Sequence, residues 1–383
     1  MVESADGFLR PEQHVSLDED EEKRLSEICP GLTLRQDADE RMDHKLWGPV
    51  LEVRSGHATD PDIRRTASSG GALSALLVHL LESGAVETIV QTGPSNELPI
   101  GNAAAISMTT SEIVAAAGSR YAPSAPLDGL EAVLAVGRPA AIVGKPCDIA
   151  ALRALARRDP RVDRTFPWMI SFFCAGVPSH RGAREVLDHL GVAEEELAAF
   201  RYRGMGWPGR ATATRHDGSQ ESMTYADSWG GILSRHVQFR CKICPDGTGG
   251  FADVVCADAW ECDSDGYPLF EETDGVSLIV SRTERGEALV RDALSAGRLS
   301  AEPFEIDAIG PIQPGQLNRK RVVIARLAAL AVLARPLPRF HGFNLVAAAR
   351  QARVRLLLRN FLGTCRRMVL TSRFFGRRKP GAT

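Results

Sequence analysis

The sequence predicts a mixed α/β fold, with an α/β core, an irregular cysteine-rich insertion and a basic helical tail at the C-terminus. Three observations lead to this prediction. Apolar strand-like runs alternate with helical patterns, cysteines gather between residues 241 and 262, and Arg, Ala and Leu dominate beyond about residue 318. Alternating strands and helices are typical of α/β domains, which place ligands at the carboxyl ends of their strands. With 383 residues and 44% hydrophobic content, the chain can bury a sizeable core.

The pattern divides the chain into four parts. Residues 1–45 are expected to be a flexible acidic lead-in, 46–130 an N-terminal domain, 131–317 a C-terminal domain with most of the cysteines, and 318–383 a basic helical tail. The acidic N-terminus lacks the basic and apolar regions of a signal peptide. Eight irregularly spaced cysteines are then expected to be reduced thiols or metal ligands, which places the protein in the cytoplasm.

The first regular element is expected in "SSGGALSALLVHLLESGAV", residues 68–86. Its leucines recur at helical spacing, Ser69 is expected to be the N-cap, and Gly84 to end the helix. The stretch "VETIVQTG", residues 86–93, then predicts a strand.

Two further units each join an apolar strand to a helix through a turn that carries a cysteine. In "PAAIVGKPCDIAALRALARR" the helix is expected to begin near Asp148, and "WMISFFCAG" ends a strand before the helical "HRGAREVLDHLG". Cys147 and Cys174 therefore lie at strand ends, where α/β sheets bind ligands. Residues 200–219 are expected to be irregular, and residues 276–299 return to a strand followed by a helix.

The cysteines allow more than one interpretation. Zinc would be bound tetrahedrally by a C-x2-C…C-x5-C set, and spacing alone favours it. A [4Fe–4S] cluster needs four thiolates that can be distant in sequence. A redox dithiol at C-x-x-C is disfavoured because no helix pattern follows. The zinc set is Cys241, Cys244, Cys256 and Cys262.

A series of motifs resembles one known family. "RCKICPDGTGGFADVVCADAW" is similar to the signature of the coenzyme F420-reducing hydrogenase β-subunit family, in which R-C-x-x-C-x-D precedes A-D-I-x-x-G-D-x-W. "TASSGGALSALL", "AAGSRYAPS", "VGKPCDIAALR", "FFCAGVPS" and "YRGMGWPG" resemble further family motifs in the expected order. The resemblance covers roughly residues 45–300.

The resemblance implies an oxidoreductase with a flavin-binding core that carries FAD and a [4Fe–4S] cluster. It exchanges electrons with coenzyme F420 (a deazaflavin), ferredoxin or another partner, and its acceptor is not identified. The cluster ligands that it implies are Cys147, Cys174, Cys241 and Cys244. A zinc-stabilised, catalytically silent scaffold that binds a partner remains the alternative.

The flavin contacts follow from the resemblance and from simple chemistry. Glycines at a helix start let backbone N–H groups approach a pyrophosphate. An arginine can pair with phosphate, and a lysine beside the flavin ring can stabilise negative charge there. The expected catalytic residues are Lys145 and Arg203. The expected FAD contacts are Thr66, Ser68, Ser69, Gly70, Gly71, Gly118, Ser119, Arg120, Tyr121, Gly144, Lys145, Asp258 and Trp260.

The charge is distributed unevenly. From residue 308 onward the chain has 16 Lys and Arg and no acidic residue, whereas the first 307 residues have a net charge of −18. Such a tail is expected to contact an anionic membrane surface or an acidic partner, or else to cover the domain with a helix. No nucleic-acid recognition module accompanies the charge, so nucleic acid is not an expected partner.

Overall fold

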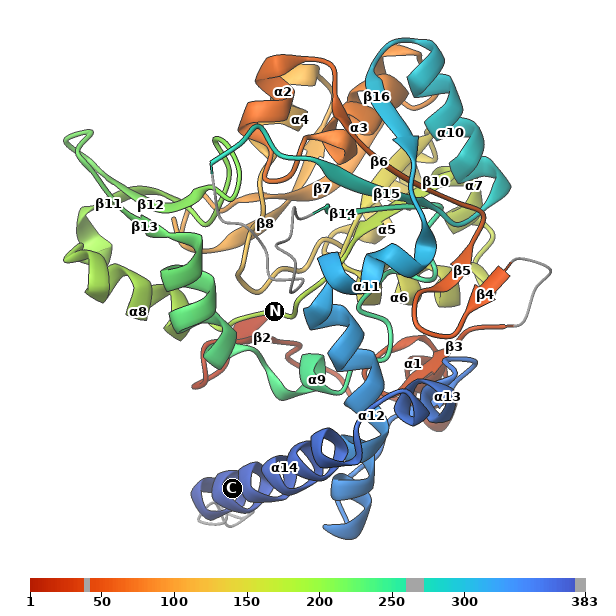
Figure 1. Ribbon diagram of the computed structural model, residues 1–383, viewed down its shortest axis with the longest axis vertical. Helices are drawn as coiled ribbons and strands as arrows, with labels where there is room; N and C mark the ends of the chain where they lie inside the picture. The colour runs from red at the N-terminus through yellow and green to blue at the C-terminus, as the bar shows by residue number, and fades with distance from the viewer. Residues whose placement is uncertain (38–41, 260–271, 376–383) are drawn as a thin grey trace.

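An eight-stranded sheet forms the centre of the computed structural model, which describes residues 1–37, 42–259 and 272–375 (Figure 1). From edge to edge its strands are β16 (Leu299–Pro303), β6 (Glu52–Ala58), β15 (Ser277–Ser281), β14 (Val254–Asp258), β10 (Trp168–Phe172), β9 (Ala140–Val143), β7 (Thr88–Pro94) and β8 (Asn102–Ser107). The pairs joining β14, β10, β9 and β7 are parallel, and the outer pairs are antiparallel. The predicted mixed α/β fold is confirmed.

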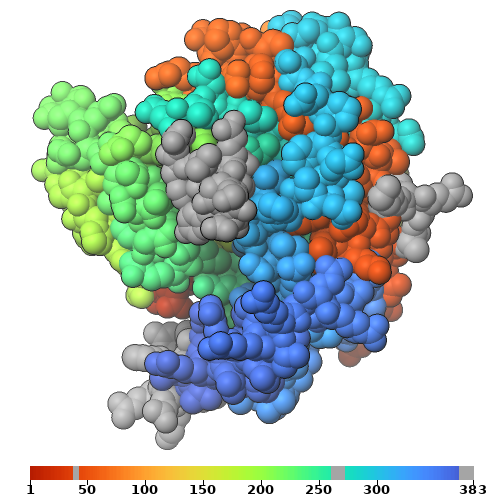
Figure 2. Space-filling view, viewed as in Figure 1, coloured from red at the N-terminus to blue at the C-terminus, as the bar shows by residue number. Residues whose placement is uncertain are grey.

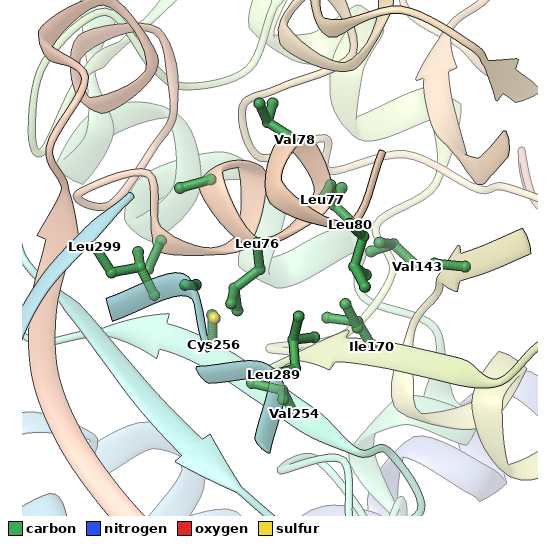
Figure 3. Close-up of a cluster of buried hydrophobic side chains, with 14 of the residues drawn as sticks. Leu76, Leu77, Val78, Leu80, Val143, Ile170, Val254, Cys256, Leu289 and Leu299 are labelled. Carbon is green, nitrogen blue, oxygen red and sulfur yellow. The ribbon is translucent and has the colours of Figure 1, made fainter. Parts of the chain in front are cut away.

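Helices cover both faces of this sheet because successive side chains of a buried strand point to opposite sides. In β10, Ile170 packs into one apolar cluster and Met169 into the other. Figure 3 shows Leu76 and Leu80 of α3 in the first cluster with Ile170. The first face carries α2 (Pro61–Thr66), α3 (Ala72–Glu82), α4 (Thr110–Ala115) and α10 (Glu284–Ser295), and the second carries α5 (Leu130–Val136), α6 (Pro146–Ala156) and α7 (Arg161–Thr165).

The predicted first helix is α3, but it begins later than expected. Its N-cap is Gly71, with a φ of 74°, and Ser69 does not cap it. The Ser69 hydroxyl instead donates to the carbonyl of Val276 at 3.1 Å. A Cβ on Gly71 would lie 2.9 Å from the carbonyl oxygen of Ile63, so the tight approach of α2 to α3 requires glycine there.

Residues 200–219 are irregular only in part, because residues 200–201 and 210–215 lie in strands that the sequence prediction missed. They contribute to a three-stranded antiparallel sheet of β11 (Leu197–Arg201), β12 (Arg210–Arg215) and β13 (Gln220–Thr224). The short alternating pattern of β12 is difficult to recognise in the sequence because a glycine-rich turn directly precedes it. This sheet and α8 (His180–Leu190) share an apolar cluster separate from the main sheet.

The first 37 residues contain regular structure, although the sequence predicts a flexible lead-in. They form β1 (Val2–Glu3), β2 (Leu9–Arg10), α1 (Glu19–Ile28) and β3 (Thr33–Arg35). The Glu3 carboxylate contacts His180 at 2.8 Å, and Glu27 of α1 forms an ion pair with Arg158. The segment is therefore held against the α/β core by specific contacts.

The C-terminal part consists mainly of helices. They are α11 (Ile309–Ile312), α12 (Pro314–Val332), α13 (Leu345–Arg350) and α14 (Val354–Phe375). In Figure 2 the darkest blue part of this segment lies at the lower end of the molecule. The predicted domain boundary at residue 318 falls inside α12. Within the described parts of the chain, no helix combines the length and the hydropathy that crossing a bilayer requires.

Candidate functional site

A cavity of about 290 Å³ lies at the carboxyl ends of β9, β10 and β14, a size near the lower end of the range for ligand pockets. Lys145 follows β9, Cys174 follows β10, and Asp258 ends β14, and all three line the cavity. Parallel strands bring these positions together because their carboxyl ends share one edge of the sheet.

Most of the residues predicted to contact a flavin line this cavity. They are Ser68, Ser69, Gly71, Gly118, Ser119, Arg120, Tyr121, Lys145 and Asp258. Thr66, Gly70 and Gly144 are described by the structure but are not among its lining residues. Trp260 lies outside the described residues.

The N-terminus of α3 opens onto the cavity, since residues 71–74 all line it. The first-turn N–H groups of a helix form a natural anion site. One of them is engaged, because the Ala72 N–H donates to the Ser277 hydroxyl at 3.3 Å. Gly70 is required for packing, because a Cβ there would lie 2.8 Å from the backbone nitrogen of Ser277.

The segment 118–121 is tied to its surroundings by polar and aromatic contacts. The Ser119 N–H donates to the hydroxyl of Ser68. The Arg120 guanidinium donates to Asn102 at 2.6 Å, and burial lowers the pKa of Arg120. Tyr121 packs against Trp229, with 4.6 Å between ring centroids. These contacts fix one wall of the cavity.

Lys145 carries a positive charge at the cavity. Its ammonium lies 2.7 Å from the Asp148 carboxylate and donates to the Ser124 hydroxyl at 2.7 Å. Burial alone would lower the pKa of Lys145, but the charge of the Asp148 carboxylate and its hydrogen bond to the ammonium raise that pKa. The lysine is therefore held protonated in a fixed position.

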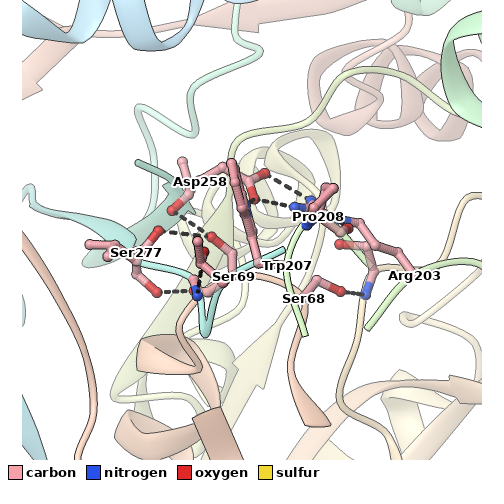
Figure 4. A network of polar contacts seen from close by, with 12 residues as sticks. Ser68, Ser69, Arg203, Trp207, Pro208, Asp258 and Ser277 are labelled. Atoms are coloured by element: carbon pink, nitrogen blue, oxygen red, sulfur yellow. Dashed lines mark hydrogen bonds and ion pairs between the residues drawn. The ribbon is translucent and has the colours of Figure 1, made fainter. Parts of the chain in front are cut away.

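Arg203, predicted to be catalytic, is held in a buried ion pair and does not line the cavity. Its guanidinium donates to both carboxylate oxygens of Asp258, at 3.0 and 2.5 Å, and to the carbonyl of Pro208 at 2.7 Å. Its side chain is 2% exposed. Figure 4 shows the Trp207 indole beside the same carboxylate, to which it donates at 3.1 Å. Arg203 is therefore placed to position Asp258 rather than to contact a substrate.

The four cysteines implied by the family resemblance come from three separate segments that meet in one region. Cys147 lies in the first turn of α6, Cys174 follows β10, and Cys241 and Cys244 lie in and after the short helix α9 (Phe239–Lys242). The Cys174 N–H donates to the carbonyl of Gly247 at 2.8 Å, and the Val177 N–H points at the Cys241 sulfur at 3.4 Å. The loop after β10 therefore lies against the loop that carries the C-x-x-C pair.

The thiols of this group influence one another electrostatically. Burial raises the pKa of Cys147 well above its ordinary value, and Cys174 and Cys244 add to this increase. Burial raises the pKa of Cys174 to about 12, with contributions from Cys241 and Cys244. Without a bound metal, the thiols of Cys147 and Cys174 are therefore protonated at neutral pH, and metal binding would release their protons.

Among the residues that the structure describes, no three or more His, Cys, Asp or Glu side chains are placed to hold a metal ion. A single Zn²⁺ needs its sulfurs about 4 Å apart, whereas four thiolates around a cubane are spread more widely. Cys256 of the predicted zinc set lies in the apolar core, as Figure 3 shows, and only burial shifts its pKa. Cys262 lies outside the described residues.

Helix α12 supplies donors that the sequence prediction missed. Gln316 and Arg319 donate to the carbonyl oxygen of Cys174, at 3.0 and 2.8 Å. Lys320 donates to the carbonyl of Pro245 at 3.0 Å, and burial lowers the pKa of Lys320 to about 8. The polar run "QPGQLNRK" between two apolar segments was the available signal, but its partners are distant in sequence.

The comparison with protein families and the comparison with individual proteins agree with each other. The chain matches the family described as coenzyme F420 hydrogenase/dehydrogenase, beta subunit, with the N-terminal part at residues 53–131 and the C-terminal part at residues 137–307. It is 27% identical over 304 residues to the coenzyme F420 hydrogenase subunit beta of Methanococcus voltae, which covers 75% of this chain and 99% of the relative.

Two further similarities extend this picture. The coenzyme F420-dependent sulfite reductase of Methanocaldococcus jannaschii is 26% identical over 235 residues, covering 57% of this chain and 34% of that protein. A chain of the F420-reducing [NiFe] hydrogenase complex from Methanosarcina barkeri has the same fold, with a TM-score of 0.59 and 20% identity. That match covers 78% of this chain and 99% of the other.

Proposed function

The chain belongs to the coenzyme F420 hydrogenase/dehydrogenase beta-subunit family, and we propose that it passes electrons between coenzyme F420 or ferredoxin and an unidentified acceptor, using FAD and a [4Fe–4S] cluster. Its relatives include proteins named as a hydrogenase subunit, a formate dehydrogenase subunit and a sulfite reductase, and these names support a general oxidoreductase role for this chain. One observation carries the finer proposal. Cys174 lines the cavity and also lies against the loop of the C-x-x-C pair.

The residues around the cavity fit a flavin nucleotide. Leu73 and Ser74 in the first turn of α3 line the cavity and offer N–H groups to a pyrophosphate. Lys145 supplies a fixed positive charge, which favours negative charge on a nearby ring. Phe172 and Phe173 also line the cavity and add apolar surface. The donor set suits an anionic cofactor with a flat apolar part.

The four thiols fit an iron–sulfur cluster better than a single zinc ion. Their number and residue type match a cubane, and Cys256 of the competing zinc set lies in the apolar core. A Cβ on Gly176 would lie 2.6 Å from the Val237 side chain and 3.1 Å from the Cys241 Cβ. This glycine lets the loop after β10 approach the C-x-x-C loop closely.

When bound, a flavin supplies hydride exchange and a cluster supplies single-electron transfer. This chain would hold both groups at one edge of its sheet and place positive charge beside the ring through Lys145. Cys147 and Cys174 are partly buried, and Cys174 lines the cavity. The proposed electron donor is a deazaflavin or a ferredoxin-like protein.

The direct test is the visible spectrum of anaerobically purified protein, followed by addition of reduced coenzyme F420 or reduced ferredoxin. We expect flavin bands together with broad absorbance near 400 nm, and bleaching by at least one donor. The Cys174→Ala variant should lose the broad absorbance, whereas Cys256→Ser, the matched control, should keep it. A colourless protein that contains zinc would contradict the proposal.

A further inference from the structure

Helix α14 has two faces with different environments. Thr364 is 5% exposed and faces inward, where Asn360 accepts a hydrogen bond from Arg326 of α12 at 2.8 Å. A separate row of large aliphatic side chains is turned to solvent. It consists of Val354, Leu358, Leu362 and Val369, which are 70%, 56%, 63% and 43% exposed. The spacing of four, four and seven residues places them on one side of a helix.

Arginines flank this aliphatic row. Arg355 and Arg359 come directly after Val354 and Leu358 in the sequence. Arg366 comes about one helical turn after Leu362, and all three arginines are exposed. On a helix with 3.6 residues per turn they form a strip directly beside the row. No acidic residue occurs from residue 308 onward, so no carboxylate of the helical tail neutralises the strip. The exposed side of α14 is therefore both apolar and positively charged.

We propose that this side of α14 docks on an anionic phospholipid surface. Aliphatic side chains in one row enter the boundary between headgroups and acyl chains, and the adjacent guanidinium groups pair with lipid phosphates. A protein partner fits less well, because the row is a convex strip of Val and Leu without the buried aromatic anchors typical of protein interfaces. Figure 1 shows α14 at the end of the molecule, away from the main sheet.

This inference goes beyond the proposed electron transfer and does not depend on it. It concerns residues beyond the two matched family regions, which end at residue 307. The full-length chain can be tested without cofactors, so a failure of lipid binding leaves the oxidoreductase proposal untouched. A protein without flavin or cluster in the spectroscopic test would likewise leave the lipid-docking proposal unaffected.

The experiment is co-sedimentation of the full-length protein with phosphatidylcholine vesicles that contain or lack phosphatidylglycerol. We expect binding only to the anionic vesicles, weakened by added salt. The triple variant Arg355→Gln/Arg359→Gln/Arg366→Gln should bind about 100-fold more weakly, at about fivefold per arginine. The variant Leu358→Ser/Leu362→Ser should also bind more weakly, because it keeps the attraction of the arginines to the headgroups but loses the apolar side chains that enter the acyl-chain boundary.

Two matched controls remove similar side chains elsewhere. Val136→Ser removes an aliphatic side chain that is 66% exposed on α5, and Arg24→Gln removes an exposed arginine of α1. Both should bind as the unchanged chain does. Equal binding to vesicles without phosphatidylglycerol would overturn the proposal, as would binding unaffected by the leucine variant. Self-association through the aliphatic row without lipid binding, seen by light scattering, would overturn it too.

Discussion

The guanidinium of Arg319 donates a hydrogen bond to the main-chain carbonyl of Cys174, with 2.8 Å between Nη1 and the oxygen. Its other terminal nitrogen donates to the carbonyl of Ala175. One arginine of α12 thus holds two consecutive carbonyls of the loop that leaves β10. The helix that opens the basic tail is in this way part of the cysteine site.

Replacing Arg319 with Gln should loosen this loop. Hydrogen bonds to a charged group contribute about 2 kcal/mol each. Without Arg319 the Ala175 carbonyl loses this donor, and the Cys174 carbonyl keeps only the bond from Gln316. We expect faster reaction of the Cys174 thiol with a maleimide reagent in metal-free protein, and a lower iron content after anaerobic purification. Arg335→Gln, an exposed position beyond the end of the same helix, is the control. Equal labelling rates in the two variants would refute the role given to Arg319.

The Arg203–Asp258 pair should contribute to stability rather than to reaction with substrate. Removing one partner of a buried ion pair typically costs about 3–5 kcal/mol because the remaining charge is buried alone. Asp258→Asn should therefore lower the free energy of unfolding by about 3 kcal/mol in urea titrations. Asp128→Asn, at an exposed position, should change it little. If Asp258→Asn unfolds at the same urea concentration as the unchanged chain, the pair has no such role.

Lys145 should matter for cofactor retention. Its ammonium is held between Asp148 and Ser124 at the cavity wall, so its loss removes a fixed positive charge. Lys145→Met should weaken flavin binding about tenfold or more, measured by fluorescence titration of cofactor-free protein with FAD. The control Lys45→Met removes an exposed lysine that is distant from Lys145 in the sequence, and it should leave that affinity unchanged. An unchanged affinity in Lys145→Met would place the flavin elsewhere.

The pair of Arg54 on β6 and Glu287 on α10 predicts a pH dependence of stability. The two side chains form hydrogen bonds of 2.8 and 2.7 Å, and Glu287 is 5% exposed. Burial alone would raise the pKa of Glu287, but the bonds from Arg54 lower it below its ordinary value of 4.5. Because the folded pKa is depressed, the stabilisation is complete above about pH 4.5 and is lost as the pH falls through the folded pKa.

The variant Glu287→Gln isolates this contribution. At pH 7 it should be less stable than the unchanged chain by about 3 kcal/mol, and the difference should shrink progressively below pH 4.5. Urea unfolding at a series of pH values measures both quantities. A difference that stays constant down to pH 3 would show that the carboxylate charge is not responsible.

The local pattern of the sequence predicted the elements that bear the site. β9 with α6 and β10 with Cys174 follow from short apolar runs, a cysteine-bearing turn and helical periodicity. Because these strands are parallel neighbours, their carboxyl ends meet, and the thiols of Cys147 and Cys174 come into the same region. The resemblance to a family added Cys241 and Cys244, which spacing alone assigned to zinc.

The remaining features depend on contacts between distant parts of the chain. Arg203 and Asp258 are 55 residues apart, so the sequence could not show that a candidate catalytic arginine is held by a carboxylate. Arg319 reaches a carbonyl 145 residues away. The start of α3 was misplaced because Ser69 has the chemistry of an N-cap, whereas packing against α2 selects Gly71.

X-ray absorption at the iron and zinc edges of anaerobically purified protein tests the shared thiol site most directly. We predict that the thiols of Cys147, Cys174, Cys241 and Cys244, which span 98 residues of sequence, surround iron. The iron spectrum should then show sulfur neighbours and a second shell of iron in the unchanged chain and in Cys256→Ser. Cys174→Ala should show neither. Zinc with sulfur neighbours only, or an iron signal that persists unchanged in Cys174→Ala, would contradict it.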